Sequence, residues 1–316
     1  MAALLLCSCS DKEAMQQTTM EIAVSPTIAE ASRSIPITSI SGVDQLDVNV
    51  YRHDTGGFYF KDLAAAVSGR TEFVFSKAHY WLPGIPLDFY AYTPSPCVDN
   101  VVIENGTIKF DYDQDKHSST SQYDADILTG SSEGVLYEDT NNGVVPMKLD
   151  HALCLVEFAV AYDEENGFKT SKIGKDVVIT ELRLRNVSLQ GRCTVNGDQC
   201  NWDVSTPTEW VIADFTEGGT KEGLRVGTDI SAGDFINTPD RKHTFIVVPD
   251  QILSEMQVSF IEGAPFTYTT NFSTTPIKLK AGKHYVINLS IKSNEVTVTD
   301  TSVRSWIQDS NIYVTM

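Results

Sequence analysis

Apolar and polar residues alternate with a period of two over many short stretches of this chain, which is the pattern of β-strands rather than helices. The longest mostly apolar run is residues 144–160, VVPMKLDHALCLVEFAV. From Ala152 onward every second residue is apolar, and Leu153 and Leu155 make the first half of this part apolar on both faces. A strand that is covered on both sides usually lies at a seam, so we expect this run at the junction of two domains.

Short strand patterns recur on both sides of this run. Strands separated by turn sequences every ~8 to 12 residues are typical of β-sandwiches. The chain of 316 residues therefore predicts an all-β protein with two sandwich domains in tandem, at 41–145 and 146–316, behind an N-terminal segment at 1–40. The strand patterns lie at 46–50, 73–75, 87–92, 108–112, 178–184, 245–248, 285–291 and 296–298.

The N-terminal segment contains one embedded strand pattern. Met20, Ile22 and Val24 alternate with polar or small residues, and we expect Pro26 to end this strand. Arg33 follows in EASRSIP, a small-residue segment flanked by proline, of the kind that stays exposed and is cut by proteases. The alternative interpretation of Arg33 is an ordinary surface arginine.

Two of the six cysteines flank a predicted hairpin. Cys193 and Cys200 enclose CTVNGDQC, in which Asn196-Gly197 is a favoured centre for a two-residue type I′ turn. With that centre Cys193 directly faces Cys200, at a Cα distance of ~4.5 to 5.5 Å that a disulfide accepts. An oxidising compartment would close the bond, and a reducing one would leave two thiols. The six cysteines match no zinc pattern.

The composition argues against some classes of function. A net charge of −18 and a pI near 4.6 argue against nucleic-acid binding, which depends on Lys and Arg neutralising phosphates. Such acidity is typical of a soluble, solvated surface. The hydrophobic content of 41% is enough to form cores, and the sequence has no run of ~18 apolar residues that could span a bilayer.

Some sequence motifs match catalytic or metal-binding patterns, but the residues around them do not fit such sites. Ser132 lies in a GxSxG pattern, but the residues after it cannot form the helix that a nucleophile elbow needs. Asp111, Asp113 and Asp115 begin like a calcium loop, but Lys116 stands where that loop requires glycine. The six histidines include no pair at the i, i+4 spacing. The sequence therefore predicts no catalytic residues, metal site or cofactor.

The first residues resemble a bacterial lipoprotein leader. Leu6-Cys7-Ser8-Cys9 is similar to a lipobox, in which the last cysteine, here Cys9, is acylated. The following SDKE resembles the charged sequence that sends lipoproteins to the cell surface in Bacteroidota. Only MAALLL stands before Cys7, where a signal peptide should have a basic start and a longer apolar stretch, so either the start codon is placed late or the cysteine is ordinary. An acylated Cys9 would anchor a soluble body to a membrane without spanning it.

Several further segments follow the lipobox-like cysteine and Arg33: YWLP at 80–83, LDFYAYTP at 87–94, YDADIL at 123–128, LDHAL at 149–153, AGKHY at 281–285 and VRSW at 303–306. Taken in this order, they resemble the fimbrillin family, the pilus-subunit lipoproteins of Bacteroidales. The resemblance covers nearly the whole chain, and the ordered set of motifs is more specific than any one of them.

This resemblance implies two transthyretin-like β-sandwich domains and a structural or adhesive, non-enzymatic subunit of a fimbrium at the outer membrane. It also implies assembly by strand exchange, in which a protease cuts after Arg33 and the emptied groove accepts a strand from another subunit. The expected partners are other fimbrial subunits of the same or another sequence, host or bacterial surface ligands, and a membrane through the lipid anchor alone.

Strands at opposite ends of the chain carry the same apolar spacing, so either could fill one groove with side chains in alternate pockets. The C-terminal one could instead close a sheet of its own domain, as in a tip or accessory subunit. The two sets of predicted exchange residues are Met20, Ile22 and Val24, and Ile312, Val314 and Met316.

Two other functions compete with this interpretation. A surface glycan-binding lipoprotein would use exposed aromatic residues as stacking platforms, although aromatics in these positions are more often core. A secreted hydrolase would need a nucleophile and a base in a suitable sequence context, and this sequence shows no such arrangement. The aromatic residues in question are Tyr80, Trp81, Tyr90, Tyr92, Trp202 and Trp210.

Overall fold

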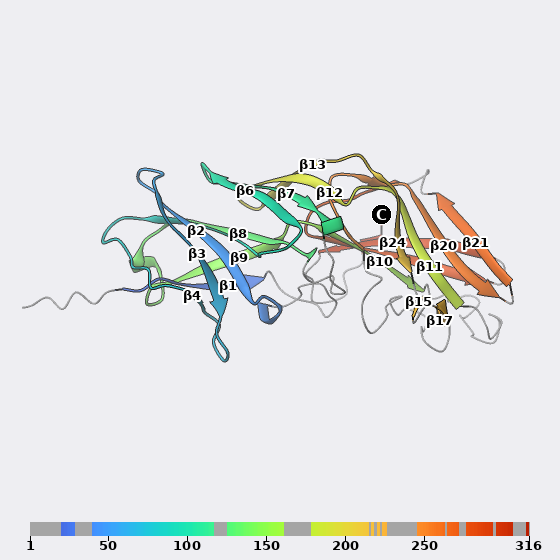
Figure 1. The fold of residues 1–316 in the computed structure, drawn as a ribbon, viewed down its shortest axis with the longest axis horizontal. Coiled ribbons are helices and arrows are strands. Elements are labelled where there is room, and N and C mark those ends of the chain that lie inside the picture. Colours follow the sequence, from blue (N-terminus) through green and yellow to red (C-terminus); the bar gives the residue numbers. More distant parts are fainter. Residues whose placement is uncertain are drawn as a thin grey trace, which may run out of the picture.

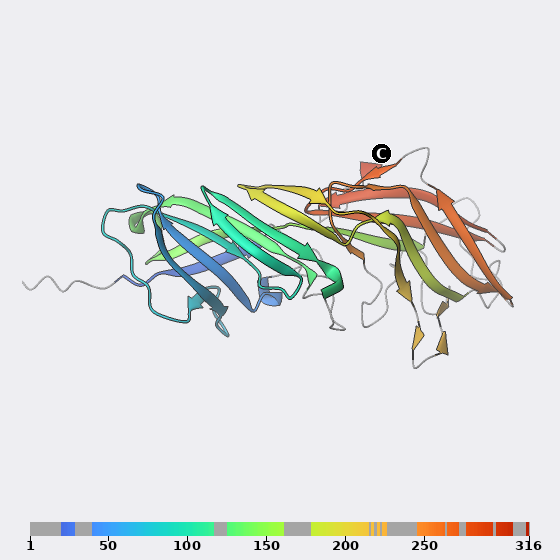
Figure 2. The same ribbon diagram turned by 45° about the horizontal axis from the view of Figure 1, so that its top comes forward.

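The computed structural model is built almost entirely of β-strands, as the sequence predicts (Figure 1). Within the described residues, helical structure is limited to short 3₁₀ turns, and no helix is long and apolar enough to cross a membrane. The body is elongated, with an N-terminal and a C-terminal lobe placed end to end (Figure 2). The structure describes residues 20–28, 40–116, 125–160, 178–214, 216–217, 220–221, 223–225, 245–262, 264–271, 276–292, 295–305 and 314–315.

Seven strands close into a barrel in the N-terminal lobe, in the order β1-β4-β3-β2-β5-β8-β9. Every neighbouring pair is antiparallel except β1 and β9, which are parallel. Alternate residues of each strand point inward and form one buried apolar core. The strands are β1 (Ala23–Ile28), β2 (Gln45–Arg52), β3 (Phe58–Ala66), β4 (Phe73–Phe75), β5 (Leu87–Tyr92), β8 (Leu128–Val135) and β9 (Val144–His151).

A four-stranded sheet, in the order β13-β12-β7-β6, joins the two lobes. It pairs a hairpin from the first half of the chain with one from the second, along seven residue pairs between β7 and β12. A separate core lies beneath it and includes Tyr112, Leu153 and Trp202. The strands are β6 (Val98–Glu104), β7 (Thr107–Asp113), β12 (Gln190–Asn196) and β13 (Gln199–Val204).

Two further sheets face each other in the C-terminal lobe, and their inner faces share a third core. One has the order β18-β10-β23-β24-β25, and the other has the order β14-β11-β20-β21 with β17 beside β11. β15 (Thr216–Glu217) pairs with β16 (Thr220–Lys221), and β19 (Ile252–Leu253) pairs with β22 (Ile277–Lys278). The sheet strands are β10 (Cys154–Val160), β11 (Val178–Val187), β14 (Thr208–Asp214), β17 (Leu224–Arg225), β18 (Phe245–Val247), β20 (Glu255–Glu262), β21 (Ala264–Asn271), β23 (Lys283–Lys292), β24 (Glu295–Ser305) and β25 (Val314–Thr315).

The apolar run at 144–160 forms two strands rather than one. β9 belongs to the barrel and β10 to the C-terminal lobe, with a bend at the fully buried Ala152 and Leu153. The bend is fixed because the amide of Ala152 donates to the carbonyl of Ile127, and the carbonyl of Leu153 accepts from the amide of Gly282. The predicted division between residues 145 and 146 falls inside β9. The limits of the two domains stay a prediction.

Candidate functional site

The first strand, β1, fills a gap between β4 and β9 and so closes the barrel (Figure 1). Six residue pairs join it to β9, whereas one pair, Val24 with Phe73, joins it to β4. Just before the strand, the amide of Ile22 donates to the carbonyl of His79 at 2.8 Å, and the amide of Trp81 donates to the carbonyl of Met20 at 3.0 Å. The rest of the barrel thus forms a groove that β1 occupies.

The side chains of this segment alternate between the barrel core and solvent. Ile22 and Val24 are 1% and 0% exposed, and the partly buried Met20 packs against the same core. Pro26 is buried as well, while Thr27 is exposed. The structure therefore places all three predicted N-terminal exchange residues against one core, in alternate pockets.

The strand does not end at Pro26 as predicted, but continues to Ile28. The amide of Ile22 points to the β4 side and that of Ala23 to the β9 side, where it donates to the carbonyl of Gly143. By this alternation, the amide that Pro26 lacks would point to the β4 side, where pairing has ended at Val24. Proline therefore removes no hydrogen bond to β9, and the strand can run on.

Gly143 sets how closely β1 approaches β9. Its φ of +85° lies in the left-handed region, and its carbonyl accepts from Ala23 N and from Trp81 Nε1, each at 3.3 Å. A Cβ on Gly143 would lie far inside van der Waals contact of the Glu21 carbonyl oxygen. The sequence shows Asn142-Gly143 only as a turn, and nothing in it points to this contact.

We expect Gly143→Ala to lower the free energy of unfolding by about 2–4 kcal/mol, through backbone strain and overpacking against Glu21. Amide hydrogen exchange across β1 should accelerate by more than in the rest of the barrel. Gly197→Ala is the matched control, because Gly197 has φ +60° but no atom within 4 Å of an added Cβ. Equal losses in urea denaturation of the two variants would contradict a special role for Gly143.

Asp62 on β3 binds the segment that follows β4, on the side of the groove opposite β9. Its carboxylate accepts from Ser76 Oγ at 2.5 Å, from the Lys77 amide at 3.1 Å and from His79 Nε2 at 3.0 Å. The His79 ring in turn stacks on Phe60 at 3.7 Å between ring centroids. Burial opposes ionisation of Asp62, but the hydrogen bonds outweigh it and hold its pKa at about 2.

Replacing this carboxylate should destabilise the segment after β4 and change how the stability of the protein depends on pH. We expect Asp62→Asn to lower the free energy of unfolding by about 2 kcal/mol at pH 7. Because the folded-state pKa of Asp62 is depressed, its stabilisation is complete above pH 4 and is lost as the pH falls toward 2. The stability difference between the two proteins should therefore shrink from pH 5 to pH 2, and a constant difference would contradict this assignment.

The second predicted exchange strand lies in part outside the described residues. Val314 belongs to β25, which pairs with the outer edge of β24 through Val303 and Ser302. This strand thus lies on a sheet of its own lobe, an arrangement that the sequence left open. Ile312, Met316, Cys9 and Arg33 lie outside the described residues.

The cysteine hairpin has a different register from the one predicted. Cys193 faces Trp202, and Cys200 faces Val195, because the turn is centred on Gly197 and Asp198. The two cysteines are free thiols on diagonal positions, with a hydrogen bond between their sulfurs. Burial raises the pKa of the Cys193 thiol, and the hydrogen bond from Cys193 lowers that of Cys200. The prediction that they face each other is therefore wrong.

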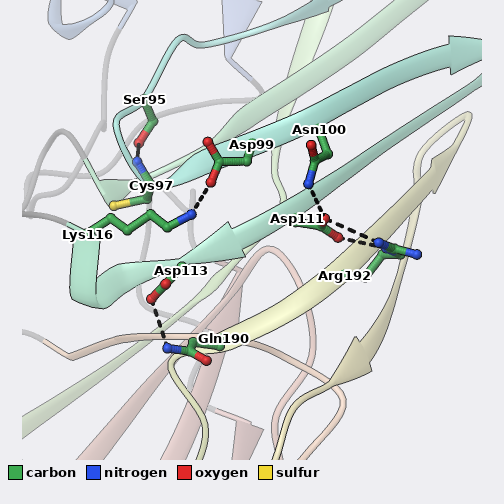
Figure 3. Close-up of polar contacts among 9 residues, drawn as sticks. All are labelled: Ser95, Cys97, Asp99, Asn100, Asp111, Asp113, Lys116, Gln190 and Arg192. Carbon is green, nitrogen blue, oxygen red and sulfur yellow. Dashed lines mark hydrogen bonds and ion pairs between the residues drawn. The ribbon is translucent and has the colours of Figure 1, made fainter.

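A polar hollow of about 610 Å³ lies over the sheet that joins the lobes. Arg192 of β12 donates to both carboxylate oxygens of Asp111 on β7, at 2.7 and 3.2 Å. Gln190 donates to Asp113 at 3.0 Å, and Lys116 pairs with Asp99. The contacts of Arg192 and Gln190 bind one hairpin to the other, whereas the pair of Lys116 and Asp99 lies within the β6–β7 hairpin (Figure 3). Within the described part of the chain, no cluster of three His, Cys, Asp or Glu side chains could hold a metal.

The other motifs considered have structural roles. Ser132 lies within strand β8 and donates to the carbonyl of Pro146 at 2.7 Å, so it is not at a strand-to-helix elbow. Of the aromatics considered for stacking on sugars, Tyr80 is 43% exposed. The side chain of Trp210 is not among those described. The others belong to the cores, with exposures of 5% for Trp81, 4% for Tyr90, 7% for Tyr92 and 8% for Trp202.

Comparison with known proteins gives consistent matches. Residues 33–306 match the family described as fimbrillin-like. A fimbrial protein from Bacteroides vulgatus superimposes with a TM-score of 0.59 at 14% identity, covering 90% of this chain and 99% of that one. A candidate cell adhesion protein from Bacteroides ovatus gives 0.59 at 16% identity, covering 93% and 100%. No curated protein matches the sequence.

Proposed function

This chain belongs to the fimbrillin-like family, and on that premise we propose that it is a lipid-anchored subunit of a cell-surface fimbrium that assembles by exchange of its first strand. It is a fimbrial subunit by family and fold. In this proposal it is a structural and adhesive component rather than an enzyme, its lipid is carried on Cys9, and its partners are other fimbrial subunits.

The observation that supports exchange is the position of β1. This strand is adjacent in sequence to none of its neighbours in the barrel, yet Ile22 and Val24 complete the barrel core. Without it, the backbone edges of β4 and β9 would lose their partner and apolar pockets would open to water. An unpaired edge beside apolar pockets is what an added strand binds.

Arg33 lies between β1 and β2 in the sequence. Cleavage after it would leave β1 bound to the barrel only by non-covalent contacts. A strand from another subunit could then compete for the groove on equal terms, because β1 would no longer have the advantage of being tethered.

The donor in this proposal is the alternating segment that contains Val314, supplied by another copy or by a related subunit. β25 lies at the edge of its sheet, where it pairs with Ser302 and Val303 of β24. An edge strand can leave its sheet without separating any other pair of strands, which suits a strand that is to be donated.

The test is to treat the purified full chain with an arginine-specific protease and to follow its size by gel filtration and by electrophoresis without heating. We expect a ladder of heat-labile oligomers from the cleaved protein and monomers from Arg33→Gln. If the cleaved protein stays monomeric, the exchange proposal is wrong. If cleaved Val314→Asp polymerises as well as the parent, the donor is not this segment.

The lipid anchor has its own test. Cells that express the full-length precursor are labelled with an alkyne fatty acid, and the protein is recovered from the outer-membrane fraction. We expect label on the parent and none on Cys9→Ala. Equal labelling of the two would overturn the assignment of Cys9.

A further inference from the structure

We infer that the strand which replaces β1 runs in the opposite direction to it, antiparallel to β9. This inference rests on the proposed strand exchange and concerns the orientation of the incoming segment. It follows from the connectivity of the barrel, and it decides at which end of the groove the donor subunit lies.

The barrel has an odd number of strands, so one neighbouring pair must be parallel. That pair is β1 with β9, and the other six are antiparallel. β4 and β9 therefore run in opposite directions across the gap. Any strand placed between them is parallel to one and antiparallel to the other, and β1 is parallel to β9.

The edge with more pairs should decide the direction. β1 makes six residue pairs with β9, but only one with β4 and one further bridge, between Glu21 and Tyr80. Antiparallel pairing is more stable per residue than parallel pairing. A reversed strand would pair antiparallel with β9 along the long edge. It would pair parallel with β4, but only along the short edge. The resident strand thus lies in the weaker orientation.

The side chains allow either direction. The buried positions of the resident segment are Ile22, Val24 and Pro26, which alternate along it. A segment with apolar residues at i, i+2 and i+4 presents the same alternation when it is reversed. The pockets therefore select for spacing, and the backbone hydrogen bonds select for orientation.

Disulfide trapping distinguishes the two orientations. The full chain carries a single new cysteine near one end of β9, at Asn141→Cys or at Lys148→Cys, both exposed sites. After cleavage at Arg33, each variant is mixed with a synthetic peptide of residues 308–316 that bears a cysteine at its N- or its C-terminus. A peptide of residues 20–28, labelled in the same two ways, shows the pattern of the resident direction, in which Ala23 pairs with Val144 and Thr27 with Lys148.

We expect the reverse pattern from the 308–316 peptide. Its C-terminal cysteine should cross-link to Asn141→Cys, and its N-terminal cysteine to Lys148→Cys, at least ten-fold more than in the opposite combinations. The pattern of the 20–28 peptide would overturn the inferred direction and leave the exchange proposal standing. Cross-linking of the 20–28 peptide alone would overturn both the donor assignment and the direction that depends on it.

Discussion

Val24→Asp should release the first strand from the barrel at a cost of about 4 kcal/mol or more. Val24 is fully buried at the middle of the groove, where the only pair between β1 and β4 is formed. A carboxylate there would have neither water nor a basic partner among the residues of the barrel core. Because β1 is the first strand in the sequence, the groove can expel it without disrupting the pairing among the other six strands.

The measurement is amide hydrogen exchange by residue, together with the binding of a dye that fluoresces on exposed apolar surface. Val24→Asp should remove protection from β1 and raise dye binding, while β2 and β5 stay protected. Thr27→Asp is the matched control, because it adds the same charge to an exposed position of the same strand. If both variants behave alike, β1 is not a part of the core that the groove depends on.

The sequence was sufficient to predict the fold class and the burial of the first strand. Alternation of period two is a local property, so it can be read without knowing which strands pair. Ile22 and Val24 show this well, because their spacing alone predicted that both side chains face a core.

Pairing partners and registers could not be predicted, because they depend on contacts between distant residues. Asn196 pairs with Gln199 in its own hairpin, but it also pairs with Thr107 of β7. That second contact belongs to the sheet that joins the lobes, and the turn sequence contains no information about it. The predicted register around Cys193 and Cys200 failed because the turn is centred on Gly197 and Asp198, with the positive φ at Gly197, and not on Asn196 and Gly197.

The residues that shape the groove were missed for a related reason. Asp62 matters because Ser76 and His79 return to it, and Gly143 matters because Glu21 passes over it. Each is an ordinary polar or turn residue in its local sequence. Their role exists only once the barrel has closed, so a single sequence gives no sign of it.

We expect Trp202→Ala to lower the free energy of unfolding of the whole chain by about 3–5 kcal/mol. Trp202 is on β13, from the second half of the chain, but its ring meets Phe110 and Tyr112 of β7 edge-on, with centroids 5.7 and 6.0 Å apart. Its Nε1 donates at 2.8 Å to the carbonyl of Ala152, at the bend between the lobes. One side chain therefore fills the core that both lobes share.

We expect Trp202→Ala to uncouple the unfolding of the two lobes as well as to lower stability. With this core emptied, calorimetry should show two separate unfolding transitions, one for each lobe, where the parent shows more cooperative unfolding. Trp202→Phe keeps most of the volume but leaves the Ala152 carbonyl without its donor, so it should cost about 1–3 kcal/mol. Asn201→Ala, at an exposed position next to it, should change little. A single transition in Trp202→Ala, with a loss below about 1 kcal/mol, would show that the lobes are joined mainly by the β7–β12 backbone pairing.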